Sequence, residues 1–171
     1  MKTETSSFRL EKEIFTEFKK HAKDKGLTTN SLLNKIMKEY MEWGSKATAL
    51  QIIPYPSKII MKLLNKQTEE ELRKIGKEHV KENFSENLLL LKNEESVEAY
   101  LEMTKSFCDA SGFSYSTKEK NGTVNFTIRH NQGTKFSILV DEIVKTQLEI
   151  VTKNRAETKQ MTNSVSFWIS F

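Results

Sequence analysis

The chain has 171 residues and a formal net charge of +4, and hydrophobic residues make up 37% of it and charged residues 29%. This balance is typical of a globular protein and argues against an intrinsically disordered one. No apolar run approaches the ~20 residues that span a bilayer, and the first residues lack the apolar stretch of a signal peptide. The single cysteine, Cys108, excludes an intramolecular disulfide, which fits a reducing interior. We therefore expect a cytoplasmic protein with no membrane partner.

A short segment with alternating polarity opens the chain. Over residues 6–10, Phe8 and Leu10 point to one face of an extended segment, and Ser7 and Arg9 point to the other. This alternation predicts a β-strand with one apolar and one polar face. The net charge alone permits nucleic-acid binding without indicating it, so this pattern carries more weight than the composition.

Two amphipathic helices are expected after the strand. The first opens at Glu11 and is stopped by Gly26, and the second follows Thr28, a good N-cap residue, and ends near Trp43. Their apolar residues recur at spacings of three and four, as on one face of a helix. These residues are Ile14, Phe15, Phe18 and Ala22 in the first helix, and Leu32, Leu33, Ile36, Met37 and Tyr40 in the second.

Such a unit of about 40 residues is too small to bury a core of its own. Its single strand also leaves both edges without hydrogen-bond partners, which favours association. Two copies could pair their strands in an antiparallel ribbon and enclose the apolar residues between four helices. We therefore predict that residues 1–46 form a dimerisation domain and that the protein is a homodimer or a higher homo-oligomer.

The order of these elements, with Thr5 to Leu10 as the strand and Gly26-Leu27-Thr28 as the turn, resembles the ribbon-helix-helix family of transcriptional regulators. This is the class of the Arc and MetJ repressors, which read DNA with a β-ribbon. The resemblance covers about residues 4–43, and the rest of the chain resembles no family. One departure is Ser6, which stands where the family usually has an inward apolar residue.

The resemblance implies two sets of contacts with double-stranded DNA. The outward strand residues Thr5, Ser7 and Arg9 would enter the major groove, where an arginine can donate two hydrogen bonds to guanine. Residues at the start of the second helix would hold a phosphate, because the amides there form an anion site. By position these residues are Thr28, Thr29 and Asn30. Lysines at 19, 20, 23 and 25 could add attraction to phosphate, although such a run is usually only the solvated face of a helix.

The second half of the chain predicts a separate α+β domain over residues 57–171, joined by a linker over residues 47–56 that contains two prolines and at most a short strand at Leu50–Ile53. Asn121-Gly122 between two alternating segments is a strong hairpin signal. Trp168 alternates with apolar residues of the last strand and is expected to lie under a helix or in a subunit contact. The expected elements are helices at 57–66, 68–83, 94–111 and 135–151, and strands at 113–118, 123–130 and 164–171. The helix at 68–83 opens with the capping-box pattern Thr68-Glu69-Glu70-Glu71.

No set of residues in the sequence predicts catalysis, a metal site or a cofactor. The histidines His21, His79 and His130 and the lone Cys108 lack the close pairing of zinc ligands. His130 ends a strand before a glycine-containing turn. Such a turn could hold a ligand, but most turns of this kind only connect a strand to the next helix. Cys108 lies on an apolar helix stripe and is expected in the core.

The leading interpretation is a sequence-specific, dimeric transcriptional regulator and not an enzyme. Its second domain would sense a small-molecule or protein effector, add oligomeric contacts, or do both. One alternative is the DNA-binding antitoxin of a toxin-antitoxin pair, although such tails tend to be short and disordered. The other is a protein-interaction module that uses its N-terminal unit only to dimerise.

Overall fold

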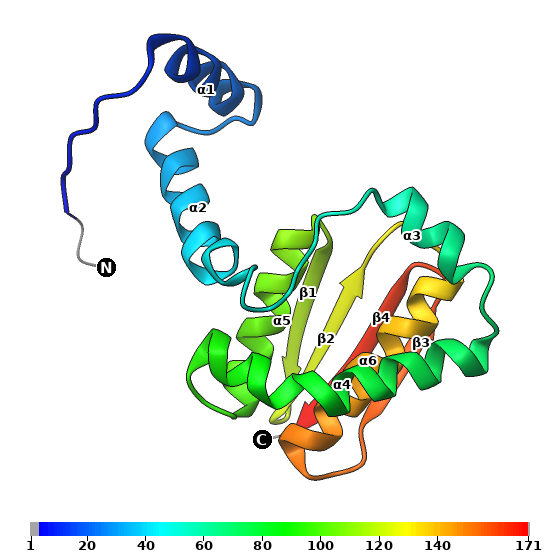
Figure 1. Ribbon diagram of the computed structural model, residues 1–171. Helices are drawn as coiled ribbons and strands as arrows, with labels where there is room; N and C mark the ends of the chain where they lie inside the picture. The colour runs from blue at the N-terminus through cyan, green and yellow to red at the C-terminus, as the bar shows by residue number, and fades with distance from the viewer. Residues whose placement is uncertain (1–3, 171) are drawn as a thin grey trace. The chain divides into compact units, whose positions relative to one another are not determined.

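The computed structural model describes residues 4–170, and the chain divides into two compact units, Met1–Met41 and Glu42–Phe171. Helices and strands follow one another along the chain as labelled in Figure 1. Their order is α1 (Lys12–Asp24), α2 (Thr29–Glu42), the 3₁₀ helix η1 (Gly44–Lys46), α3 (Ser57–Leu64), α4 (Glu69–Lys92), α5 (Val97–Ser111), β1 (Ser114–Lys120), β2 (Thr123–Arg129), α6 (Thr134–Thr152), β3 (Glu157–Met161) and β4 (Ser164–Ser170).

The first unit contains the two predicted helices, α1 and α2, with the predicted turn between them. Gly26 has a φ of +67°, a left-handed conformation that a residue without a side chain adopts at little cost. The Leu27 amide donates to the Ala22 carbonyl at 2.9 Å, which closes the end of α1 in a Schellman-type turn. Thr28 then caps α2, because its hydroxyl accepts a hydrogen bond from the Ser31 amide at 3.0 Å.

The strand predicted over Ser6–Leu10 is absent from the single chain. Residues 4–11 have no regular secondary structure, and none of the strands in residues 4–170 pairs with them. A strand is stabilised by hydrogen bonds to a neighbouring strand, and this segment has no such neighbour among residues 4–170. The predicted ribbon-helix-helix fold of this unit is therefore supported for its two helices and not for its β-ribbon.

The second unit has the predicted α+β fold, built on a four-stranded antiparallel sheet with the order β1-β2-β4-β3. Asn121 and Gly122, at φ values of 53° and 71°, form the tight turn of the predicted β1–β2 hairpin. Strand β3 was not predicted; it is a short edge strand that forms a second hairpin with β4. Phe167 of β4 lies opposite Phe126 of β2 on one side and Thr158 of β3 on the other.

Apart from Trp168 and Met161, the large apolar residues of the sheet point to the face that carries α4, α5 and α6. The rings of Phe126 and Phe167 stack at 5.1 Å between centroids, and Tyr100 of α5 lies 5.9 Å from Phe167. Burying a side chain of this size stabilises the fold by about 1.5–3 kcal/mol. The buried core consists of Val80, Phe84, Leu88, Leu91, Ala99, Tyr100, Met103, Cys108, Phe126, Ile128, Val140, Val144, Leu148, Val165, Phe167 and Ile169.

Helix α4 begins at the predicted capping box and continues beyond its predicted end. The Thr68 hydroxyl accepts from the Glu71 amide at 3.2 Å, and the Thr68 amide donates to the Glu71 carboxylate at 2.6 Å. The helix extends to Lys92 because Leu88 and Leu91 continue its buried face. At Gly76 an added Cβ would stand 3.2 Å from the Leu139 carbonyl of α6, so glycine allows the two helices to cross closely.

The segment around the predicted linker has no strand. Residues 47–51 form turns, and residues 52–56 have no regular structure, so the short strand expected at Leu50–Ile53 is wrong, again because no partner strand lies beside it. All of this segment belongs to the second unit. Leu50 packs against the core, and Lys46 donates to the Leu91 carbonyl at 2.8 Å.

The opposite face of the sheet is polar and is not covered by the helices of this unit. Trp168 lies on this face beside Asn125 of β2 and Glu157 of β3, and it is half-buried. The expectation that a helix covers Trp168 is therefore wrong within this unit, while a subunit contact stays a prediction. Within residues 4–170, no helix has both the length and the apolar content needed to cross a membrane.

Candidate nucleic-acid interface

The three residues predicted to contact bases lie in the extended segment before α1. Thr5, Ser7 and Arg9 are all exposed, as are Phe8 and Leu10, which were expected to face inward. Arg9 forms no ion pair with any residue in the described part of the chain. Its guanidinium can therefore reach an external acceptor without first breaking an internal contact.

The predicted phosphate contacts lie together at the first turn of α2. Thr28 is the cap, and Thr29 and Asn30 are the first two residues of the helix. Amides in a first turn have no partner within the helix, and the helix dipole places partial positive charge there. Thr28 and Asn30 are exposed and Thr29 is half-buried, so this turn is accessible to an anion.

Most apolar side chains of the first unit are exposed to solvent. Its buried residues are Ala22 and Leu32, whereas Phe8 is 64% exposed and Ile14 is 59% exposed. Further exposed members of this set are Leu10, Leu27, Ile36, Met37, Tyr40 and Met41. These exposed apolar side chains outnumber the two buried residues of the unit, and this is its most distinctive structural feature.

The basic residues of α1 are less distinctive. Lys20, Lys23 and Lys25 are exposed, and the ammonium of Lys19 lies 4.4 Å from the centroid of the Phe15 ring. Acidic residues are interspersed with them along the helix, so they do not form a continuous positive stripe. Each of these lysines could contact a phosphate, but no neighbouring residue distinguishes one of them as a phosphate contact.

In the second unit, His130 is a satisfied structural residue. The Gln132 amide donates to His130 Nδ1 at 3.2 Å, which places the ring proton on Nε2. Nε2 then donates to the Ser137 hydroxyl at 3.0 Å, and that hydroxyl donates to the Thr162 carbonyl at 3.1 Å. Burial lowers the pKa of His130, because a charged ring would lose its hydration. This chain of hydrogen bonds connects the turn before α6 with the β3–β4 turn.

A second polar cluster lies between α4 and α6. Arg73 donates to Asp141 at 3.1 Å and to Glu142 at 3.4 Å, and it also pairs with Glu69 at 2.9 Å. Asp141 and Glu142 are both buried, so Arg73 balances charge that would otherwise be costly. Arg73 contacts one oxygen of each carboxylate, and Asp141 Oδ1 is buried without a hydrogen-bond partner among the described residues. Because both carboxylates pair with Arg73 across the two helices, we assign the cluster to helix packing.

Cys108 lies in the core, as expected from its helix stripe, and burial raises the pKa of its thiol to about 12. A thiol in this state is a poor nucleophile and a poor metal ligand. Among residues 4–170, no three histidine, cysteine or acidic side chains are grouped so that they could hold a metal ion.

Comparison of the chain with protein-family models, with curated proteins and with solved structures finds no match.

Proposed function

We propose that the chain is a dimeric, sequence-specific DNA-binding regulator of the ribbon-helix-helix type. In this proposal residues 6–10 of two copies pair as an antiparallel ribbon that enters the major groove. Thr5, Ser7 and Arg9 contact base edges, and the first turn of α2 holds a phosphate. The chain binds DNA and performs no reaction.

The exposed apolar surface of the first unit is the observation that carries this proposal. A unit whose buried residues are Ala22 and Leu32 has almost no core, and a second copy is the partner that would cover Phe8, Leu10 and Ile14 symmetrically. The same pairing would supply the missing hydrogen-bond partner of residues 6–10. One event therefore accounts for two features of the single chain, its exposed apolar residues and its unpaired extended segment.

The folded second unit favours a regulator over an antitoxin. Residues 42–171 contain a buried core and a complete antiparallel sheet, whereas a toxin-wrapping tail is typically short and disordered. In the regulator this unit senses an effector or adds contacts between protomers.

The proposal is tested with the full chain and DNA from its own upstream region in a gel-shift assay at fixed salt. Arg9→Ala should weaken specific binding by about tenfold or more per half-site, since a two-hydrogen-bond contact to guanine is lost. Arg9→Lys keeps the positive charge but loses the planar guanidinium with its paired donors. Compared with Arg9→Ala, it should therefore regain affinity for nonspecific DNA but not the preference for the cognate site.

Lys35→Ala is the matched control, because Lys35 is an exposed cation inside α2 that pairs with Glu39 of the same helix at 3.6 Å. It should leave specific affinity within about twofold of wild type. Equal affinity of wild type and Arg9→Ala for the cognate site would remove Arg9 from the set of base-reading residues. If the wild type dimerises and shows no DNA binding, the interaction-module alternative is correct.

A further inference from the structure

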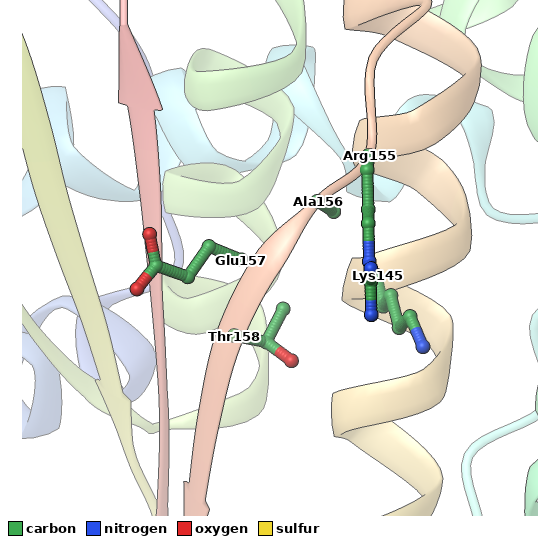
Figure 2. A pocket seen from close by; sticks show the side chains of 5 residues that line it. All are labelled: Lys145, Arg155, Ala156, Glu157 and Thr158. Carbon is green, nitrogen blue, oxygen red and sulfur yellow. The ribbon is translucent and has the colours of Figure 1, made fainter.

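A pocket of about 420 Å³ lies where α6 meets the edge strand β3. It is lined by Lys145 of α6, by Arg155 and Ala156 of the connection, and by Glu157 and Thr158 of β3. Figure 2 shows the side chains of Lys145 and Arg155 beside α6 and that of Thr158 directed into the space between β3 and α6. A volume in this range suits a small organic ligand.

The acidic residue among the lining residues does not face the two cations. In the sheet register Glu157 lies opposite Trp168, which is on the polar face, whereas Thr158 lies opposite the buried Phe167. Successive residues of a strand point to opposite faces, so the Glu157 side chain leaves the pocket that Thr158 enters. Figure 2 agrees, with the Glu157 carboxylate directed toward β4.

The two acidic residues that precede Lys145 on α6 form ion pairs with a residue of another helix and not with Lys145. Asp141 and Glu142 both pair with Arg73 of α4. Neither Lys145 nor Arg155 forms an ion pair with any residue in the described part of the chain. Two neighbouring cations without a counter-charge repel one another, and a bound anion would relieve this repulsion.

We propose that this pocket binds a small molecule that carries a phosphate monoester. Arg155 presents a planar fork of donors, Lys145 adds a point charge, and the Thr158 hydroxyl supplies a further donor. Together they match a tetrahedral oxyanion. A phosphate monoester carries a charge of about −1.5 to −2 at pH 7 on one tetrahedral group, which balances both cations. A single carboxylate would leave one cation unpaired, and a dicarboxylate would hold its two charges on separate planar groups. The organic part of the ligand would fill the remaining volume. The inference does not depend on DNA binding, because the pocket and its test lie within residues 42–171.

The test is isothermal titration of the full chain with glycerol 3-phosphate, with succinate as the carboxylate probe. Wild type should bind glycerol 3-phosphate, and Arg155→Gln and Lys145→Gln should each weaken binding by about tenfold, the usual effect of losing a hydrogen bond to a charged group. Circular dichroism should confirm that both variants keep the wild-type fold, since neither side chain pairs with another described residue.

Lys159→Gln is the matched control, because Lys159 is an exposed cation on the same strand that lies opposite Ser166, on the polar face of the sheet. Its affinity should stay within about twofold of wild type. The proposal is overturned if wild type does not bind glycerol 3-phosphate, if succinate binds as tightly, or if Lys159→Gln weakens binding as much as the pocket variants do.

Discussion

The two units of this protein treat their apolar residues in opposite ways. The second unit buries sixteen residues in one core beneath a four-stranded sheet. The first unit buries Ala22 and Leu32 and leaves larger side chains such as Phe8 and Tyr40 more than half exposed. The second unit therefore has a core of its own within a single chain, although α3 and the segment before it leave side chains such as Ile53 and Leu63 exposed. The first unit has two helices and a capped turn but almost no core.

This contrast shows how size and topology decide whether an amphipathic pattern is satisfied within one chain. In the second unit, α4, α5, α6 and the four strands surround one apolar layer and bury their apolar faces against it, whereas the short helix α3 has no buried residue. In the first, two short helices and an extended segment cannot enclose their apolar faces. The same sequence signal thus leads to a core in one case and, in our proposal, to an interface in the other.

The largest effect is expected from Phe167→Ala. Phe167 is fully buried between Phe126 and Tyr100, so its truncation should lower the free energy of unfolding of the second unit by about 3–5 kcal/mol. Chemical denaturation measures this loss. Trp168→Ala changes the adjacent residue on the polar face and should cost only about 1 kcal/mol. An equal loss at Trp168 would show that a second copy covers this face.

A smaller effect, about 1.4 kcal/mol in the free energy of unfolding of the first unit, is expected when the protein concentration is raised tenfold. A fragment of residues 1–46 should fold only as a dimer, so a tenfold higher concentration should stabilise it by this amount and raise its melting temperature. The melting temperature of a fragment of residues 42–171 should not depend on protein concentration, unless this fragment forms subunit contacts of its own. A monomeric mass and a concentration-independent melt of the first fragment would contradict the ribbon-helix-helix assignment.

The smallest effect concerns pH and the second unit alone. Burial lowers the pKa of His130 below its ordinary value of 6.5, so the folded state binds fewer protons than the unfolded state just below that pH. Neutral His130 therefore contributes stability above pH 6.5, and this contribution is lost as the pH falls toward the lowered pKa. Unfolding measured between about pH 5 and pH 7.5 should show a flatter dependence for His130→Gln than for wild type. His79→Gln, at an exposed helix position, should keep the wild-type slope; equal slopes in all three proteins would exclude His130 as the cause.

Local signals in the sequence predicted most of the second unit. Thr68 with Glu71 located the start of α4, and Asn121-Gly122 located the first hairpin, because caps and tight turns depend on residues only a few positions apart. The end of α4 and the strand β3 were missed. Residues 157–161 carry polar side chains on both faces, so their alternation gives no apolar signal, and only their pairing with β4 makes them a strand. The pocket lined by Lys145 and Arg155 was missed for the same reason, since it exists only where β3 lies against α6.

By itself, the sequence determined the helices, their caps, the hairpin turn and the apolar faces, because each depends on spacing and on conformational preferences within a few residues. The tertiary structure decided which of those faces are covered. It showed that Trp168 lies on the open side of the sheet and that His130 is held by hydrogen bonds to two turns. It also showed that Ser6–Leu10 has no partner strand within the described part of its own chain. Pairing, burial and the grouping of charges depend on residues distant in sequence, and periodicity along one segment carries no information about which distant segment will lie beside it.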